Sequence, residues 1–136
     1  MIPYQTNVSK LSGTNYQEVY KHAHDLFRRI EQKTKRKPYI RSAYFHKEKI
    51  FFDFFWTHLW RSGGNKERVR RLKYFQAALA VLQRSKNKPA SKENPNKRSE
   101  ILHRFAGMTK ERELFYVQVK ELKNGRKYLM SCFPPE

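Results

Sequence analysis

Cysteine is almost absent from this chain, because Cys132 is the only one among 136 residues. A single thiol forms no internal disulfide, and it cannot build a zinc site from several thiolates. No two of the five histidines are four residues apart, the helical spacing that zinc proteases use. We therefore expect no metal site and no cofactor, and stability that comes from packing alone.

Long hydrophobic runs are also missing. The longest apolar stretch, residues 50–60, contains Asp53 and His58 and is far shorter than the roughly 20 residues that span a bilayer. The first ten residues have no apolar segment behind a positively charged start, which a secretory signal would show. We expect a cytoplasmic protein with no membrane partner.

The sequence lacks the short motifs of most enzyme classes. It contains no glycine-rich phosphate loop, nucleophile elbow, paired acidic metal site or dinucleotide fingerprint. Metal-independent RNA cleavage remains open, because it needs only a base for the 2′-hydroxyl, cations for the charge on phosphorus and an acid for the leaving oxygen. Histidine, lysine, arginine, serine and tyrosine can supply all of these.

Acidic residues are scarce: 12 Asp and Glu stand against 30 Lys and Arg, a net charge of +18. Such an excess destabilises a compact state by self-repulsion unless a polyanion relieves it. Aromatic residues make up 15% of the chain, enough for hydrophobic burial to offset the entropy of ordering. The composition indicates one folded basic domain, residues 1–136, whose partner is a nucleic acid and preferably RNA.

Helical periodicity dominates residues 14–85, where apolar side chains recur at steps of three and four. The expected elements are a helix from Thr14 or Asn15 to the basic run 33–37, a short strand over 39–45, a helix over 50–60 and a long helix from Asn65 to about Arg84. Aromatic residues would also tolerate an extended start to the segment 50–60.

The C-terminal part, residues 86–136, lacks the helical period, and much of it alternates apolar and polar residues every second position. Residues 86–99 have no apolar periodicity and predict a mobile loop. In the part 100–136, alternation predicts three antiparallel strands, over 101–107, 114–122 and 126–133. Helices followed by a sheet indicate an α+β fold, with N-terminal helices packed on a C-terminal antiparallel sheet of three to four strands.

The pair Asn124-Gly125 predicts a type I′ turn between the last two strands. Counting back from Lys123 opposite Arg126 gives the register of the hairpin. The covered face should pair Val117 with Cys132 and Val119 with Met130. The open face should pair Tyr116 with Phe133, Gln118 with Ser131 and Lys120 with Leu129. Because the open face mixes polar and aromatic side chains, it makes a poor core and a plausible site.

Basic residues concentrate between Arg61 and Lys86, a stretch whose only acid is Glu67. A solvated helix face normally mixes charges of both signs, so this excess favours contact with phosphates over the alternative of a solvated face. The candidate nucleic-acid-binding residues are Arg68, Arg70, Arg71 and Lys73 on the helix, with Tyr116 and Gln118 on the sheet.

Two histidines are candidates for proton transfer. His58 shares a predicted helical face with aromatic residues, which favours a core position. His103 shares a strand side with Ile101 and Phe105, so the simplest alternation directs Arg104 to the open face. A bulge would reverse this assignment.

The segments SEILHRFAG, LFYVQVKE and NGRKYLMSCFP, within residues 99–134, resemble the sheet of the barnase, EndoU, colicin and RelE superfamily of phage and mobile-element ribonucleases, and RRLKYFQAAL adds weaker support. The resemblance implies helices followed by an antiparallel sheet whose open face cuts RNA without metal and leaves a cyclic phosphate. It also allows for a cognate inhibitor protein as a partner.

The positions that match the family's pattern of exposed sheet residues are Arg104, Lys120 and Ser131, and Lys73 would add a cation from the helix. Arg104 and Lys120 would stabilise the charged transition state, Ser131 would orient the phosphate, and His103 or His58 would move the proton. The expected function is a toxin-type endoribonuclease. The alternative is a non-catalytic RNA- or DNA-binding accessory protein, and a ribosome-associated basic protein is a third possibility.

Overall fold

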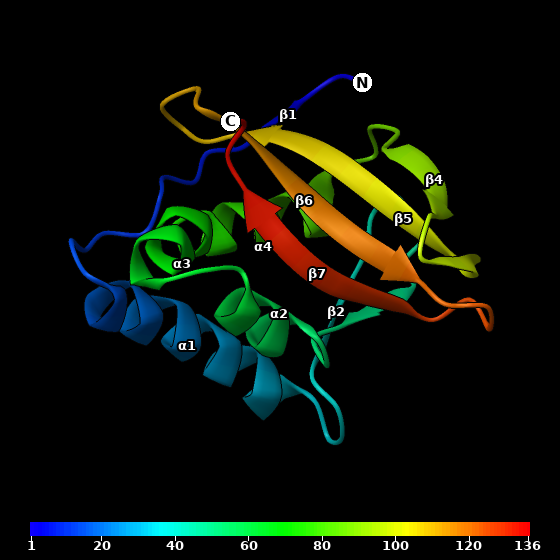
Figure 1. Ribbon diagram of the computed structural model, residues 1–136, viewed down its shortest axis with the longest axis horizontal. Coiled ribbons are helices and arrows are strands. Elements are labelled where there is room, and N and C mark those ends of the chain that lie inside the picture. Colours follow the sequence, from blue (N-terminus) through cyan, green and yellow to red (C-terminus); the bar gives the residue numbers. More distant parts are fainter.

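The computed structural model describes residues 1–136 and confirms the α+β class. Four helices lie against one curved sheet (Figure 1). The helices are α1 (Tyr16–Lys33), α2 (Phe55–Arg61), α3 (Asn65–Leu72) and α4 (Phe75–Arg84). The strands are β1 (Tyr4–Gln5), β2 (Tyr39–Arg41), β3 (Lys49–Phe51), β4 (Ala90–Asn94), β5 (Lys97–Met108), β6 (Leu114–Glu121) and β7 (Lys127–Phe133). None of the helices combines the length and apolar character that a membrane crossing needs.

The first helix begins where the sequence predicted. The Asn15 side chain accepts a hydrogen bond from the backbone N–H three residues later, at 3.0 Å, and so caps the helix. Val19, Ala23 and Phe27 are its buried residues, and their four-residue spacing defines one apolar face. The helix packs against α3 and α4.

The expected helix over 50–60 is only partly correct. Its first residues belong to β3, and α2 begins at Phe55. Ile50 is fully buried and pairs with Lys127 in a parallel ladder between β3 and β7. Pairing with β7 therefore overrides the helical spacing at the start of this segment.

The expected helix from Asn65 to Arg84 is divided into α3 and α4 at Lys73 and Tyr74. The Lys73 carbonyl accepts a hydrogen bond at 2.8 Å from the backbone N–H of Leu11. In a continuous helix the Lys73 carbonyl would accept from the N–H four residues later. Here it accepts from the N-terminal segment, and the helix is interrupted. Gly64, not Asn65, occupies the N-cap position of α3.

The sheet is larger than expected and mixed in direction. Its strand order is β1-β5-β6-β7-β3-β2, and β4 pairs with a separate part of β5. The strands β5, β6 and β7 are antiparallel, as predicted, but β1 runs parallel to β5 and β3 runs parallel to β7. Short N-terminal segments thus extend both edges, which corrects the expected antiparallel sheet of three to four strands.

The turn between β6 and β7 is not the predicted type I′ turn. Gly125 donates to the Leu122 carbonyl at 2.9 Å, and it is the one residue of this turn with a positive φ, +88°. Leu122, and not Lys123, therefore lies opposite Arg126. The loop contains three residues and ends in a left-handed glycine.

A β-bulge at Met130 compensates for the longer turn. Between the turn and the bulge the predicted pairs are wrong, because Val119 pairs with Leu129 and Lys120 pairs with Tyr128. Beyond the bulge the predicted pairs are confirmed: Val117 with Cys132, Tyr116 with Phe133 and Gln118 with Ser131. The face assignment at the far end of the hairpin is therefore correct.

The expected loop over 86–99 contains strand β4, which pairs antiparallel with the first part of β5. Ser91 lies directly opposite His103 in this ladder. The side chains of β4 are nearly all exposed. An exposed edge strand needs no apolar alternation, which explains why no strand was predicted at β4.

The helices cover one face of β5, β6 and β7 (Figure 1). On this face α4 packs closely against Gly107 of β5. A Cβ atom at Gly107 would lie 2.5 Å from Cγ2 of Val81 on α4. The opposite face carries Arg104, Gln118 and Ser131, and we call it the open face. Since β3 pairs with only the start of β7, the rest of this strand's edge contacts α2 and α3.

Candidate functional site

Side chains from five elements converge on a hollow where α2 and α3 meet the open face. The hollow has a volume of about 400 Å³. It is lined by His58, Arg70, Arg71, Arg104, Tyr116, Gln118, Ser131, Phe133, Pro134, Pro135 and Glu136, and we call it the arginine hollow. Most of the predicted site residues meet here.

Arg71 is held on two sides at the edge of the hollow. Its Nε donates to Oε1 of Glu67 at 2.9 Å, one turn earlier on α3. Its Nη1 donates at 3.2 Å to Oγ of Ser131, a buried residue of β7. The guanidinium also lies 5.7 Å from the centre of the Phe133 ring. Because these contacts fix its position, Arg71 presents a pre-oriented cation to the hollow.

Glu67 is the one acid that partners the helix arginines. It also accepts a hydrogen bond from Nη1 of Arg70 at 3.1 Å. The hydrogen bond from Arg71 is the main cause that lowers the pKa of Glu67, and the charges of the two arginines add to it. Glu67 therefore remains ionised at neutral pH and orients Arg71.

Arg104 enters the hollow from β5 and is exposed. Its Nη2 donates to Oε1 of Gln118 at 3.4 Å. The guanidinium lies 5.5 Å from the ring centre of Tyr116 and 5.2 Å from that of Phe133. These aromatic faces support the cation without neutralising its charge. The simplest alternation of β5 thus gives the observed position of Arg104.

His58 lies at the surface of α2 and not in the core, which corrects the position favoured by its aromatic neighbours in sequence. Partial desolvation lowers the pKa of His58, and the charges of Arg71 and Lys120 lower it further. The imidazole is therefore mainly neutral at pH 7. A neutral imidazole beside two arginines is chemically suited to accept a proton.

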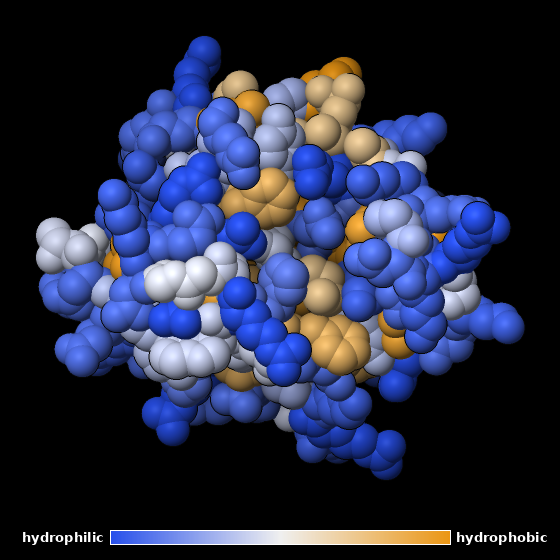
Figure 2. Space-filling model, in the orientation of Figure 1, coloured by the Kyte–Doolittle hydropathy of each residue, from blue (hydrophilic) through white to orange (hydrophobic).

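The surface around the arginine hollow alternates cations with aromatic rings. Figure 2 shows single hydrophobic side chains among hydrophilic ones over the region of β5, β6 and β7. The acids nearest to the cations are Glu67, bonded to the α3 arginines, and Glu136, which lines the hollow. Arg104 forms no ion pair and keeps its full charge for a ligand.

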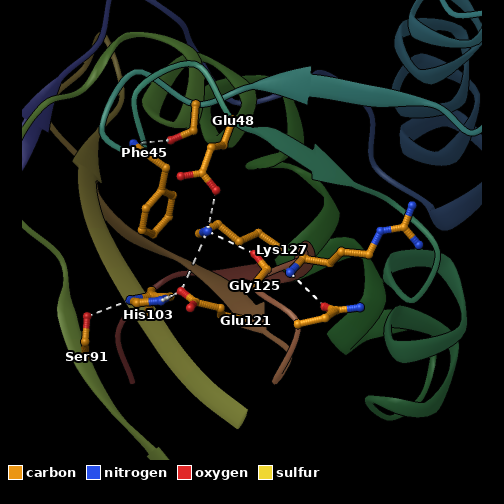
Figure 3. A network of polar contacts seen from close by, with 10 residues as sticks. Phe45, Glu48, Ser91, His103, Glu121, Gly125 and Lys127 are labelled. Atoms are coloured by element: carbon orange, nitrogen blue, oxygen red, sulfur yellow. Dashed lines mark hydrogen bonds and ion pairs between the residues drawn. The ribbon is translucent and has the colours of Figure 1, made fainter.

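His103, a predicted catalytic residue, lies outside the arginine hollow. Its ring is buried on the covered side of β5, 4.9 Å from the ring centre of Phe45. Its Nδ1 and the Ser91 Oγ are 2.7 Å apart, and its Nε2 is 2.9 Å from Oε1 of Glu121 (Figure 3). Strand alternation sends the side chain away from Arg104, so His103 is not available to a ligand on the open face.

The same polar network continues across the sheet through Lys127. The Lys127 ammonium is buried and lies 3.8 Å from Glu121 and 2.7 Å from Glu48 (Figure 3). It also donates to the Gly125 carbonyl at 3.0 Å. The network therefore joins β4, β5, β6 and β7 to the residue before β3, and its buried charges are all paired.

Three further predicted residues also lie outside the arginine hollow. Arg68 donates twice to the Trp60 carbonyl, at 2.7 and 3.1 Å, and its guanidinium lies 3.7 Å from that indole. Lys73 lies at the junction of α3 and α4. Lys120 lines a neighbouring hollow and lies 3.5 Å from Glu100. Helical spacing alone could not separate Arg68 from Arg71, because the separation depends on where α3 meets β7.

No role for Phe133 or Glu67 was predicted from the sequence. Phe133 supports both Arg71 and Arg104, and its predicted pairing with Tyr116 was the available signal. Glu67 precedes Arg70 and Arg71 by three and four residues, the spacing at which helical side chains form ion pairs.

No protein-family model matches the chain, and neither a curated protein nor a solved structure is significantly similar to it.

Proposed function

We propose that the protein binds RNA on its open face and cleaves it in the arginine hollow as a metal-independent endoribonuclease. The observation that carries this proposal is the convergence of Arg71, Arg104, Ser131 and a largely neutral His58 on one hollow. These are the cations, the hydrogen-bonding hydroxyl and the base that phosphodiester cleavage requires. The resemblance of residues 99–134 to toxin-type phage and mobile-element ribonucleases supports the same class of reaction.

The reaction is an internal transesterification. His58 takes the proton of a 2′-hydroxyl, the 2′ oxygen forms a bond to phosphorus, and the bond to the 5′ oxygen breaks. Arg71 and Arg104 stabilise the negative charge on the phosphoryl oxygens, and Ser131 orients the phosphate. The leaving 5′ oxygen receives a proton from the imidazolium or from the Tyr116 hydroxyl, and the products end in a 2′,3′-cyclic phosphate and a 5′-hydroxyl.

Incubation of the purified protein with total RNA in excess chelator tests this proposal. We expect cleavage with cyclic-phosphate ends, lost in Arg104→Ala at unchanged solubility, because the lining side chains act without a metal. Induced expression should arrest growth, and Arg104→Ala or Ser131→Ala should relieve the arrest. RNA that stays intact at every pH from 5 to 8 would refute the proposed ribonuclease activity.

A non-catalytic RNA- or DNA-binding protein is the second candidate function. It is favoured by the fact that His58 is the one imidazole lining the arginine hollow, whereas efficient cleavage uses both a base and an acid. Tight, salt-sensitive binding of RNA without cleavage would select this candidate. Co-sedimentation with ribosomes, also without cleavage, would identify the protein as a ribosome-associated basic protein.

A further inference from the structure

A second basic hollow lies away from the arginine hollow, where the end of α1 meets β2, β3 and the turn before β7. Its volume is about 700 Å³. It is lined by Lys33, Thr34, Lys35, Arg36, Lys37, Tyr39, Lys49, Phe51 and Arg126, and we call it the lysine hollow. Its main segment, the run 33–37, was predicted from the sequence only as the end of a helix.

The positive charge of the lysine hollow is almost uncompensated. Of its six cations, only Lys37 has an acidic partner, Asp53, at 2.7 Å. The other five are exposed and form no ion pair. Unpaired cations crowded around one hollow repel one another, and a polyanion relieves that repulsion. The hollow is therefore suited to several phosphates at once.

Aromatic rings form the other component of the lysine hollow. The rings of Tyr39 and Phe51 lie 6.1 Å apart on adjacent strands, and both are partly exposed. The Lys49 ammonium lies 4.5 Å from the Tyr39 ring centre, and the Arg126 guanidinium lies 5.1 Å from that of Phe51. The Arg41 guanidinium also lies over the Tyr39 ring, at 5.4 Å. Cations next to partly exposed aromatic rings are the usual means of holding both backbone and bases of an unpaired strand, and a base would stack on these rings by displacing a cation.

A row of aromatic contacts leads from the lysine hollow toward the arginine hollow. Phe51 lies 5.8 Å from Tyr128, which lies 4.7 Å from Phe54, and the Lys120 ammonium is 5.4 Å from the Phe54 ring centre. Lys120 is two residues from Gln118 on β6 and shares its face. Three successive rings, of which Tyr128 is buried and Phe54 exposed, followed by the Lys120 ammonium thus lie between the two hollows.

We propose that the lysine hollow is a second binding site for single-stranded RNA, which holds the part of the strand that extends beyond the arginine hollow. This inference rests on the proposed RNA-binding function. A single strand fits better than a duplex, since paired bases expose no faces for Tyr39 and Phe51. An anionic membrane fits less well, because the exposed large hydrophobic residues, Phe54 and Trp60 among them, do not line this hollow.

Fluorescence anisotropy with a labelled 2′-O-methyl RNA of about 12 nucleotides, a length within the range of known single-strand sites, tests the inference without cleavage. The variant is Lys49→Gln combined with Arg126→Gln. The matched control is Lys21→Gln combined with Lys88→Gln, which removes two exposed charges elsewhere. We expect the variant to bind about tenfold or more weakly, with the salt slope lowered by about two, and the control to change little.

Separate outcomes decide the two proposals. If the wild-type protein does not bind the single strand, the proposed function fails. If it binds and the variant is no weaker than the control, the lysine hollow is not a binding site and the proposed function stands. A blunt duplex of the same sequence should bind more weakly, and equal binding would refute the single-strand preference. Binding to vesicles of anionic lipid that the variant loses, with RNA binding retained, would assign the hollow to membranes and refute the inference.

Discussion

The Arg71 guanidinium donates to the Ser131 hydroxyl at 3.2 Å, although the two residues are 60 positions apart in the chain. The same guanidinium is bonded to Glu67 on its own helix. This contact joins α3 to β7 and fixes one side of the arginine hollow before any ligand arrives. The site is therefore built from a helix and a strand, which hold a cation more firmly than a loop does.

Replacing Arg104 should separate catalysis from binding. Arg104→Ala should reduce the cleavage rate by about a hundredfold or more, because it removes a cation directed at the developing charge. Most of the RNA affinity should remain, since other cations contact the strand. Single-turnover rates and anisotropy on the same substrate check this. Arg28→Ala removes an exposed charge on α1 and should leave both quantities nearly unchanged.

The rate of cleavage should depend on the protonation of His58. Because the pKa of His58 is lowered from 6.5, the neutral form that accepts a proton already predominates at pH 7. The rate should rise with pH through a midpoint below 6.5 and then level off. A series of kcat/KM values from pH 5 to 8 measures this midpoint. His58→Gln should lower the rate and remove the rise, and an unchanged profile in that variant would exclude His58 as the base.

Glu67 should contribute stability that depends on pH. Its pKa in the folded state is lower than the ordinary value of 4.5, because Arg71 and Arg70 favour the ionised form. The contribution is therefore present above pH 4.5 and is lost as the pH falls through the folded-state pKa. Urea unfolding at pH 7 and at pH 3 should show Glu67→Gln less stable than wild type at pH 7, with a smaller difference at pH 3. Glu93→Gln, at an exposed position on β4, is the control and should show neither effect.

The close approach of α4 to β5 should make Gly107 sensitive to substitution. A Cβ atom there would lie 2.5 Å from Val81 and 2.8 Å from Phe115. We expect Gly107→Ala to lower the free energy of unfolding by about 1–3 kcal/mol, as overpacking does. Gly64→Ala is the steric control, because nothing lies within 4 Å of a Cβ atom at Gly64, and losing this N-cap glycine should cost less than the clash at Gly107. Equal melting temperatures for the two variants would contradict the packing described here.

The single thiol should be inert in the folded protein. Burial raises the pKa of Cys132 to about 12, so very little thiolate is present at pH 8. A chromogenic thiol reagent should react slowly with the native protein and rapidly in denaturing urea. Fast reaction under native conditions would show that β7 opens readily at this position.

The sequence was most informative where a pattern depends on neighbouring residues. The spacing of Val19, Ala23 and Phe27 predicted α1, and alternation along β5 predicted the position of Arg104. The hairpin register was correct at Gln118 and Ser131 because two errors, in the turn and at Met130, cancelled.

Features that depend on residues far apart in the chain could not be predicted from the sequence. The strands β1 and β3 have two and three residues, too few to show a period, and they are ordered by their parallel partners. The helix break at Lys73 depends on an N–H from Leu11, 62 residues earlier, which no local pattern reports. The exclusion of Arg68 from the arginine hollow likewise depends on how α3 packs against β7.

The pairing of early segments with late strands, such as β3 with β7, also sets an order of events during synthesis. The ribosome makes His58 and the arginines of α3 well before Ser131, and Tyr4 must wait for Gly107 before β1 can join the sheet. A nascent chain without β7 carries the basic helix but not the strand that orients it. The arginine hollow is therefore assembled only once residues 127–133 have left the exit tunnel, so the growing chain does not carry the finished site while earlier segments are being translated.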